Sequence, residues 1–101
     1  MKTEARGDSL VVSGVRNLGA DQAPLLRELV GSALQPDQRY VEVDLADTTF
    51  IDSEGLGALV SVHKLVVGRG GIVRLPGARP AIRELFRLTR LDQIFEFSSP
   101  S

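Results

Sequence analysis

Short runs of β-branched and aliphatic residues alternate with longer stretches whose apolar residues recur at helical spacing, and this alternation restricts the fold more than any other feature of the chain. The runs that predict strands are residues 10–15, 40–45, 72–75 and 94–97. The stretches that predict helices are residues 21–35, 53–67 and 80–89. Regular alternation of strand and helix indicates βαβ units with right-handed crossovers, and therefore a mainly parallel sheet.

Charged residues interrupt the predicted strands at alternate positions. In residues 40–45, Val41, Val43 and Leu45 alternate with acidic residues. The charged strand positions are Glu42, Asp44, Arg74 and Glu96. A sheet covered on both faces would be apolar on both. We therefore expect an α/β fold with a mixed, mainly parallel sheet of four to five strands, three to four helices packed on one face, and the other face largely open.

Length and composition exclude several classes of protein. The 101 residues predict one domain over the whole chain, with flexible tails at residues 1–8 and 98–101; residues 3–5 could instead add a short edge strand. With 12 Lys and Arg against 13 Asp and Glu, no basic face for nucleic acid is expected. Cysteine is absent, which excludes thiolate metal sites. The sequence has no apolar leader or membrane-spanning run, so we expect a cytoplasmic protein without direct membrane insertion. Oligomerisation is left open.

Two candidate sites elsewhere in the chain have ordinary structural interpretations. The single histidine, His63, lies on the apolar stripe of the second predicted helix, which is typical of a core histidine. It follows Ser53 by ten residues on that helix, about 15 Å along the axis, so the two cannot pair as base and nucleophile. At the first helix, Asp21 is the predicted N-cap, with Pro24 in the first turn. We expect neither a metal nor a cofactor.

The stretch from Thr48 to Leu59, TTFIDSEGLGAL, joins the end of a strand run to the start of a helix. The first N–H groups of a helix lack partners inside the helix, so Asp52 or Ser53 can cap it, and a serine there can hold a phosphate. Gly55 and Gly57 leave room for another backbone or a partner surface. This junction is the strongest candidate for a functional site.

From Val43 onward, the sequence VDLADTTFIDSEGLGALVSVHKLVVGRGGIVRL resembles the STAS domain, the family of bacterial anti-sigma factor antagonists. In that family a strand ending in Asp-Leu leads through a short loop to Asp-Ser-Ser/Thr-Gly-Leu-Gly, which opens a helix. The matching residues here are Asp52, Ser53, Gly55, Leu56 and Gly57. The family has the same kind of architecture as that expected above, and the similarity extends over roughly residues 9–97.

The resemblance implies a protein-interaction switch in which the chain is a kinase substrate and not an enzyme. Unphosphorylated, it would bind an anti-sigma factor that is also an ATP-dependent serine kinase, which frees the sigma factor for transcription. Phosphorylation of Ser53 would end the binding, and a phosphatase could restore it. The residues expected to bind the partner are Asn17, Asp21, Thr48, Thr49, Asp52, Ser53, Glu54, Gly55, Leu56 and Gly57.

Two further functions stay open. The chain could be a regulatory STAS subunit of a transporter or larger signalling assembly, with Ser53 acting only as a cap. It could also bind nucleotide weakly, as has been proposed for some family members, although residues 68–71 lack the lysine and Ser/Thr of a phosphate loop.

Three positions depart from the family pattern. Glu54 replaces the Ser or Thr that usually follows the phosphorylated serine, and this places a permanent charge at the site. Asn17 replaces an aspartate of the upstream partner-contacting loop, for which Asp21 is a potential substitute. Arg90 replaces a glycine after the third predicted helix, so either that turn is rebuilt or Arg90 takes a positive φ.

Overall fold

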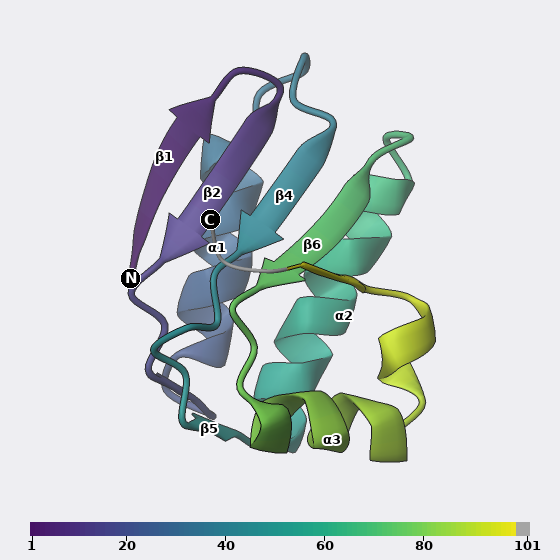
Figure 1. The fold of residues 1–101 in the computed structure, drawn as a ribbon. Helices are drawn as coiled ribbons and strands as arrows, with labels where there is room; N and C mark the ends of the chain where they lie inside the picture. Colours follow the sequence, from purple (N-terminus) through teal and green to yellow (C-terminus); the bar gives the residue numbers. More distant parts are fainter. Residues whose placement is uncertain (99–101) are drawn as a thin grey trace.

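A five-stranded sheet, in the order β1-β2-β4-β6-β7, forms the centre of the structure, a computed structural model that describes residues 1–98 (Figure 1). Its strands are β1 (Lys2–Arg6), β2 (Ser9–Ser13), β4 (Tyr40–Val43), β6 (Ile72–Pro76) and β7 (Glu96–Ser98). β1 is antiparallel to β2, and the other neighbours are parallel. The mixed, mainly parallel sheet expected from the sequence is confirmed.

Three helices pack against this sheet. They are α1 (Ala23–Ala33), α2 (Ser53–Val67) and α3 (Pro80–Leu88), with a short 3₁₀ turn, η1, at Leu91–Gln93. In Figure 1, α1 and α2 lie side by side behind the sheet, and α3 lies at the lower end, where the parallel strands have their carboxyl ends. That end also holds the loop between β4 and α2. The fold thus concentrates chain connections at one edge of the sheet.

The hydrophobic core lies between the sheet and the helices. Val12, Val41 and Val43 face it from the sheet, and Leu26 and Leu59 from the helices, all fully buried. α3 contributes Ile82 and Phe86 to the same cluster. Inward positions at every second strand residue match the alternation in the sequence. Each buried aliphatic side chain of this size contributes roughly 1.5–3 kcal/mol, so the core is the main source of stability.

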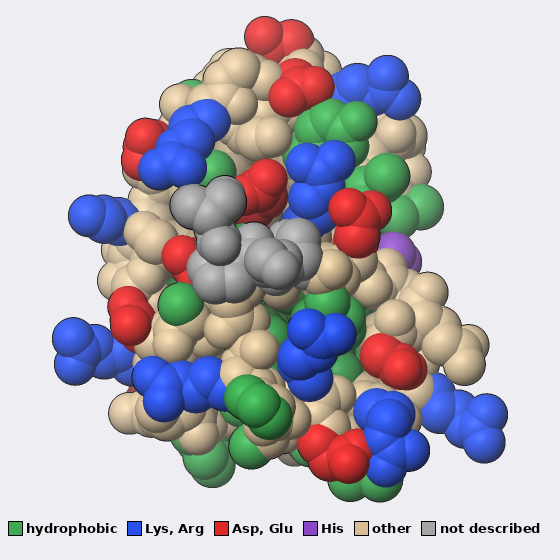
Figure 2. Space-filling model, viewed as in Figure 1, with side chains coloured by type: hydrophobic (Ala, Val, Ile, Leu, Met, Phe, Trp, Pro, Cys, Tyr) green, Lys and Arg blue, Asp and Glu red, His purple; other side chains and the backbone are tan. Residues whose placement is uncertain are grey.

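The opposite face of the sheet is polar, as expected. Arg74 on β6 is its central residue, with Nη1 3.6 Å from Glu42 Oε2 and Nε 3.1 Å from Glu96 Oε1 on the neighbouring strands. Its guanidinium also lies 4.0 Å from the centre of the Tyr40 ring. Figure 2 shows acidic, basic and hydrophobic side chains interspersed over this face, with no large region of one charge among the described residues. Cross-strand pairs therefore place the Arg74 cation between two glutamates on the open face.

The amino-terminal residues and the start of α1 differ from the main expectation. Residues 1–8 were expected to form a tail or a short edge strand, and the structure has the strand, β1. Asp21 is not the N-cap of α1; Gln22 is, without a side-chain hydrogen bond. The Gly19 carbonyl accepts hydrogen bonds from the N–H groups of Gln22 and Ala23, at 3.1 and 2.9 Å. This backbone turn satisfies these two donors, and Pro24 has no N–H, which leaves fewer donors for a side chain to cap.

The carboxyl-terminal strand begins later than the sequence predicts. Residues 94–97 were expected to form it, whereas β7 begins at Glu96 because the chain first makes η1, in which Ile94 N donates to Leu91 O at 3.2 Å. The tail predicted at residues 98–101 lies outside the described residues except for Ser98, which ends β7.

Arg90, between α3 and η1, has φ 61° and ψ 16°, in the left-handed region. It is the only non-glycine residue with positive φ among residues 1–98. Of the two alternatives for this turn, the structure has the one with Arg90 at positive φ.

We expect Arg90→Gly to raise the free energy of unfolding by up to about 1 kcal/mol. The left-handed conformation costs an ordinary residue roughly 1–2 kcal/mol, and the greater freedom of glycine in the unfolded chain offsets part of the gain. Urea unfolding of the wild type and the variant measures the difference. Arg90→Ala is the control, because it removes the side chain but keeps Cβ; equal stability of the two variants would contradict the explanation.

Candidate functional site

Two short parallel strands, β3 (Asn17–Leu18) and β5 (Phe50–Ile51), form a ribbon at the carboxyl edge of the main sheet. Thr49 N donates to Arg16 O at 3.0 Å, and Asp52 N donates to Leu18 O at 3.2 Å, so the pairing continues on both sides of the ribbon. We expected irregular loops here, because two-residue strands are too short to produce a detectable alternation. The ribbon brings residues near Asn17 beside the junction near Ser53.

Thr48 fixes the loop that leads into this ribbon. Its side chain is fully buried, and Oγ1 donates to the Val15 carbonyl at 2.6 Å. Its backbone N–H donates to Leu45 O at 3.0 Å. We expected Thr48 to contact a partner, but a side chain enclosed in this way does not reach the surface and instead positions the loop. Thr49, the next residue, is exposed.

Asp52 caps α2, which decides between the two capping candidates. Its backbone is extended, at φ −102°, and Oδ1 accepts a hydrogen bond from Gly55 N at 2.9 Å. Ser53 is the first residue of the helix, and both Ser53 and Glu54 are exposed. Because Asp52 performs the capping, the Ser53 hydroxyl has no hydrogen-bond partner within the described part of the chain.

The two glycines after Ser53 have different environments. A Cβ on Gly55 would lie 2.0 Å from the Leu18 carbonyl oxygen, whereas a Cβ on Gly57 would meet no atom within 4 Å. Both glycines were expected to leave room for a partner or another backbone. Gly55 leaves that room for the chain's own β3, and Gly57 is at the surface. Leu56, between them, is half-buried and packs against the core.

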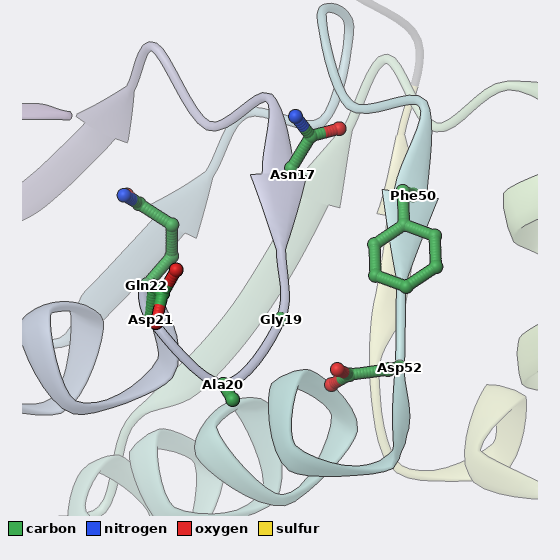
Figure 3. Close-up of a pocket in the computed structure, with 7 residues that line it drawn as sticks. All are labelled: Asn17, Gly19, Ala20, Asp21, Gln22, Phe50 and Asp52. Carbon is green, nitrogen blue, oxygen red and sulfur yellow. The ribbon is translucent and has the colours of Figure 1, made fainter.

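A surface hollow of about 360 Å³ lies beside the ribbon; we call it the Phe50 hollow. It is lined by Asn17, Gly19, Ala20, Asp21, Gln22, Phe50 and Asp52. Figure 3 shows Asn17 and Phe50 on neighbouring strands and the Asp52 side chain directed toward the turn at residues 19–22. The Phe50 residue is 50% exposed, so the hollow combines an aromatic ring with two carboxylates.

The sequence placed Phe50 within the candidate junction but did not single it out. Its position before Ile51 is consistent with a buried strand, and only the outward direction of its ring reveals a surface role. Asn17, Asp21 and Asp52, by contrast, were predicted and meet in one hollow. Ser53, Glu54 and Gly57 lie outside its lining, on the first turns of α2.

His63 has the core role expected from its position. It is half-buried on α2, and its ring contacts Phe95 edge-on, with the ring centres 5.4 Å apart. Within residues 1–98, no three His, Asp or Glu side chains are grouped to bind a metal ion. In the same range, no helix has the length and apolar character needed to cross a membrane.

Comparison with known proteins gives a consistent result. The family model for the STAS domain matches residues 1–100. The chain is 36% identical over 80 residues to an anti-sigma-B factor antagonist of Bacillus subtilis, which covers 78% of this chain and 72% of that protein.

Solved structures show the same fold. An anti-sigma-factor antagonist (STAS) domain protein from Planctomyces limnophilus has a TM-score of 0.85 at 20% identity, covering 99% of this chain and 89% of that chain. The phosphorylated form of the Bacillus cell fate determinant SpoIIAA has a TM-score of 0.77 at 17% identity, covering 99% and 90%.

The two glycines of the junction provide a matched test of the packing. We expect Gly55→Ala to lower the free energy of unfolding by roughly 1–3 kcal/mol, because the added Cβ overlaps the Leu18 carbonyl. Gly57→Ala should raise it by up to about 1 kcal/mol, since alanine is the better helix former and the space is open. Denaturant unfolding of both variants measures the effects. Similar effects of both would show that β3 does not restrict Gly55.

Proposed function

The chain belongs to the STAS domain family, and we propose that it is an anti-sigma factor antagonist controlled by phosphorylation of Ser53. The observation that carries the proposal is the exposed Ser53 at the start of α2, next to an aspartate that already caps the helix. A kinase can modify this hydroxyl without removing the cap. The fold should therefore be the same before and after modification, and only the surface should change.

The proposed switch is electrostatic. A phosphoryl group adds about −1.5 to −2 charges and three strong hydrogen-bond acceptors. Beside Asp52 and Glu54 it would build a cluster with a charge of about −4. The helix N-terminus stabilises this negative charge by only ~0.3–1 kcal/mol. A partner that packs neutral or acidic groups closely against Ser53, with water excluded from the contact, would then dissociate. The unmodified serine allows that contact.

In the proposed cycle, the unphosphorylated chain binds an anti-sigma factor with ATP-dependent serine kinase activity, and the sigma factor is released. The kinase then phosphorylates Ser53, which ends the binding, and a phosphatase resets the cycle. These events would take place in the cytoplasm. The chain is a substrate in this scheme, and it supplies a surface and not a catalyst.

The proposed partner surface consists of the β3–β5 ribbon and the first turns of α2. From the predicted set it keeps the exposed or partly exposed residues, to which the structure adds Phe50. They are Asn17, Asp21, Thr49, Phe50, Asp52, Ser53, Glu54, Leu56 and Gly57. A half-exposed aromatic ring is the kind of residue that often carries much of the binding energy when a partner buries it.

Phosphorylation at Ser53 can be tested by intact mass. The purified chain is incubated with ATP and each serine kinase that acts on anti-sigma pathways in the source cell, alongside Ser53→Ala as control. We expect the wild type to gain one phosphate and the control to gain none. No gain with any kinase, together with capture of transport proteins from the same cell, would instead favour the role of a regulatory STAS subunit.

Charge at position 53 should decide partner binding. We expect Ser53→Asp to fold like the wild type and to bind the kinase at least about tenfold more weakly, because a permanent charge enters a desolvated contact. Ser53→Ala should bind persistently, and Ser53→Asn controls for side-chain size. Titration calorimetry in the presence of a non-hydrolysable ATP analogue measures the affinities. Equal affinities of the Asp and Asn variants would refute the electrostatic switch.

A further inference from the structure

A second hollow, of about 380 Å³, adjoins the Phe50 hollow, since Asn17 lines both. Its lining also includes Arg16, Asp47, Thr49 and Arg79, and we call it the arginine hollow. All five of its residues are exposed. Arg16 precedes β3, Thr49 precedes β5, and Arg79 precedes α3, so three separate segments meet at this edge.

The two arginines of this hollow are not used in ion pairs. Within residues 1–98, no carboxylate oxygen lies within 4.0 Å of a side-chain nitrogen of Arg16 or Arg79, even though Asp47 lines the same hollow. Arg79 Nε donates to the Ala46 carbonyl at 3.1 Å, which orients its guanidinium and leaves the two terminal nitrogens available. The Arg16 carbonyl accepts from Thr49 N, so its backbone is held by the ribbon.

Three other arginines, Arg6, Arg74 and Arg87, have acidic partners. Arg74 lies between Glu42 and Glu96 on the open face. Arg87 pairs with Glu84 on α3, and this hydrogen bond lowers the pKa of the glutamate. What sets the arginine hollow apart is that two arginines without a carboxylate partner among residues 1–98, Arg16 and Arg79, line it together.

The lining favours one kind of ligand. Guanidinium groups bind carboxylates in a two-pronged geometry, and the Thr49 hydroxyl and the Asn17 amide add hydrogen-bonding groups, with Thr49 Oγ1 3.5 Å from Asn17 Oδ1. Two arginines and one aspartate leave the hollow with a single net positive charge. That charge suits one carboxylate better than a polyphosphate, which would need more cations and would be repelled by Asp47.

We propose that the arginine hollow receives an acidic side chain of the same anti-sigma factor that docks on the Ser53 surface, so that Arg16 and Arg79 determine partner choice. This inference rests on the proposed function. The Phe50 hollow presents Asp21 and Asp52, whereas the adjoining hollow presents the two arginines. A matching partner carries an acidic residue opposite the arginine hollow. A protein with a basic residue at that place is repelled by Arg16 and Arg79 and binds more weakly.

The test uses the kinase that phosphorylates Ser53, with affinity and association rate measured for the wild type and for Arg16→Glu/Arg79→Glu. We expect at least a tenfold loss of affinity at low ionic strength, and a smaller loss at high ionic strength, where exposed charges are screened.

Arg39→Glu/Lys64→Glu is the matched control. It makes the same charge change with exposed residues at the opposite end of the molecule, before β4 and in the last turn of α2. It should bind within about twofold of the wild type, as expected for charges outside the contact.

Two additions keep the test independent of folding. Arg16→Glu alone preserves the Arg79 hydrogen bond to Ala46, and thermal unfolding confirms that each variant is folded. A scan of Asp→Lys and Glu→Lys changes in the kinase should then yield at least one that restores binding to Arg16→Glu/Arg79→Glu. Such rescue identifies the acidic residue directly.

The outcomes separate the two proposals. If the wild type binds the kinase and the folded Arg16→Glu/Arg79→Glu variant binds equally well, the inference is overturned and the proposed function stands. Loss of affinity without rescue by any acidic position of the kinase would also overturn it. If the wild type binds no anti-sigma kinase, both proposals fail.

Discussion

The close approach of the Leu18 carbonyl to the first turn of α2 is the constraint on which the candidate site depends. Leu18 O accepts a hydrogen bond from Asp52 N and occupies the space where a side chain on Gly55 would be. Asp52 can then cap α2 through Gly55 N. Because the ribbon, the cap and the helix start form one hydrogen-bonded unit, Ser53 is held at the surface. Its hydroxyl has no hydrogen-bond partner in the described part of the chain. A phosphate on Ser53 would therefore be attached to a helix start that these hydrogen bonds hold in place.

Electrostatic complementarity is distributed unevenly over the molecule. On the open face of the sheet, Arg74 lies between two glutamates of the neighbouring strands, so its positive charge already has partners. At the carboxyl edge, Asp21 and Asp52 line the Phe50 hollow, and two arginines with no carboxylate partner among residues 1–98 line the adjoining one. Segments distant in sequence meet at the carboxyl ends of parallel strands, which is where such sheets commonly bind other molecules. Neighbouring hollows of opposite charge at this edge favour a protein partner that can bind in only one orientation.

The sequence predicted the order of the elements, the mainly parallel sheet and the polar open face, because hydrophobic periodicity is a local property. It also predicted that either Asp52 or Ser53 caps α2 and that His63 belongs to the core. It could not identify the β3–β5 ribbon, the buried role of Thr48 or the exposed ring of Phe50. All three features depend on contacts between the segment near residue 17 and the segment near residue 50, which are far apart in the sequence.

Local patterning by itself thus determined the α/β class and the position of the helix start that carries the candidate serine. Only the tertiary structure decided which neighbours that serine has. Gln22, not Asp21, is the N-cap of α1, where the Gly19 carbonyl accepts from the N–H groups of Gln22 and Ala23, and Gly55 is required because β3 passes close to it. The physical reason is that hydrogen-bond satisfaction and close packing depend on contacts between segments distant in sequence. Hydrophobic periodicity, by contrast, is a property of each segment alone.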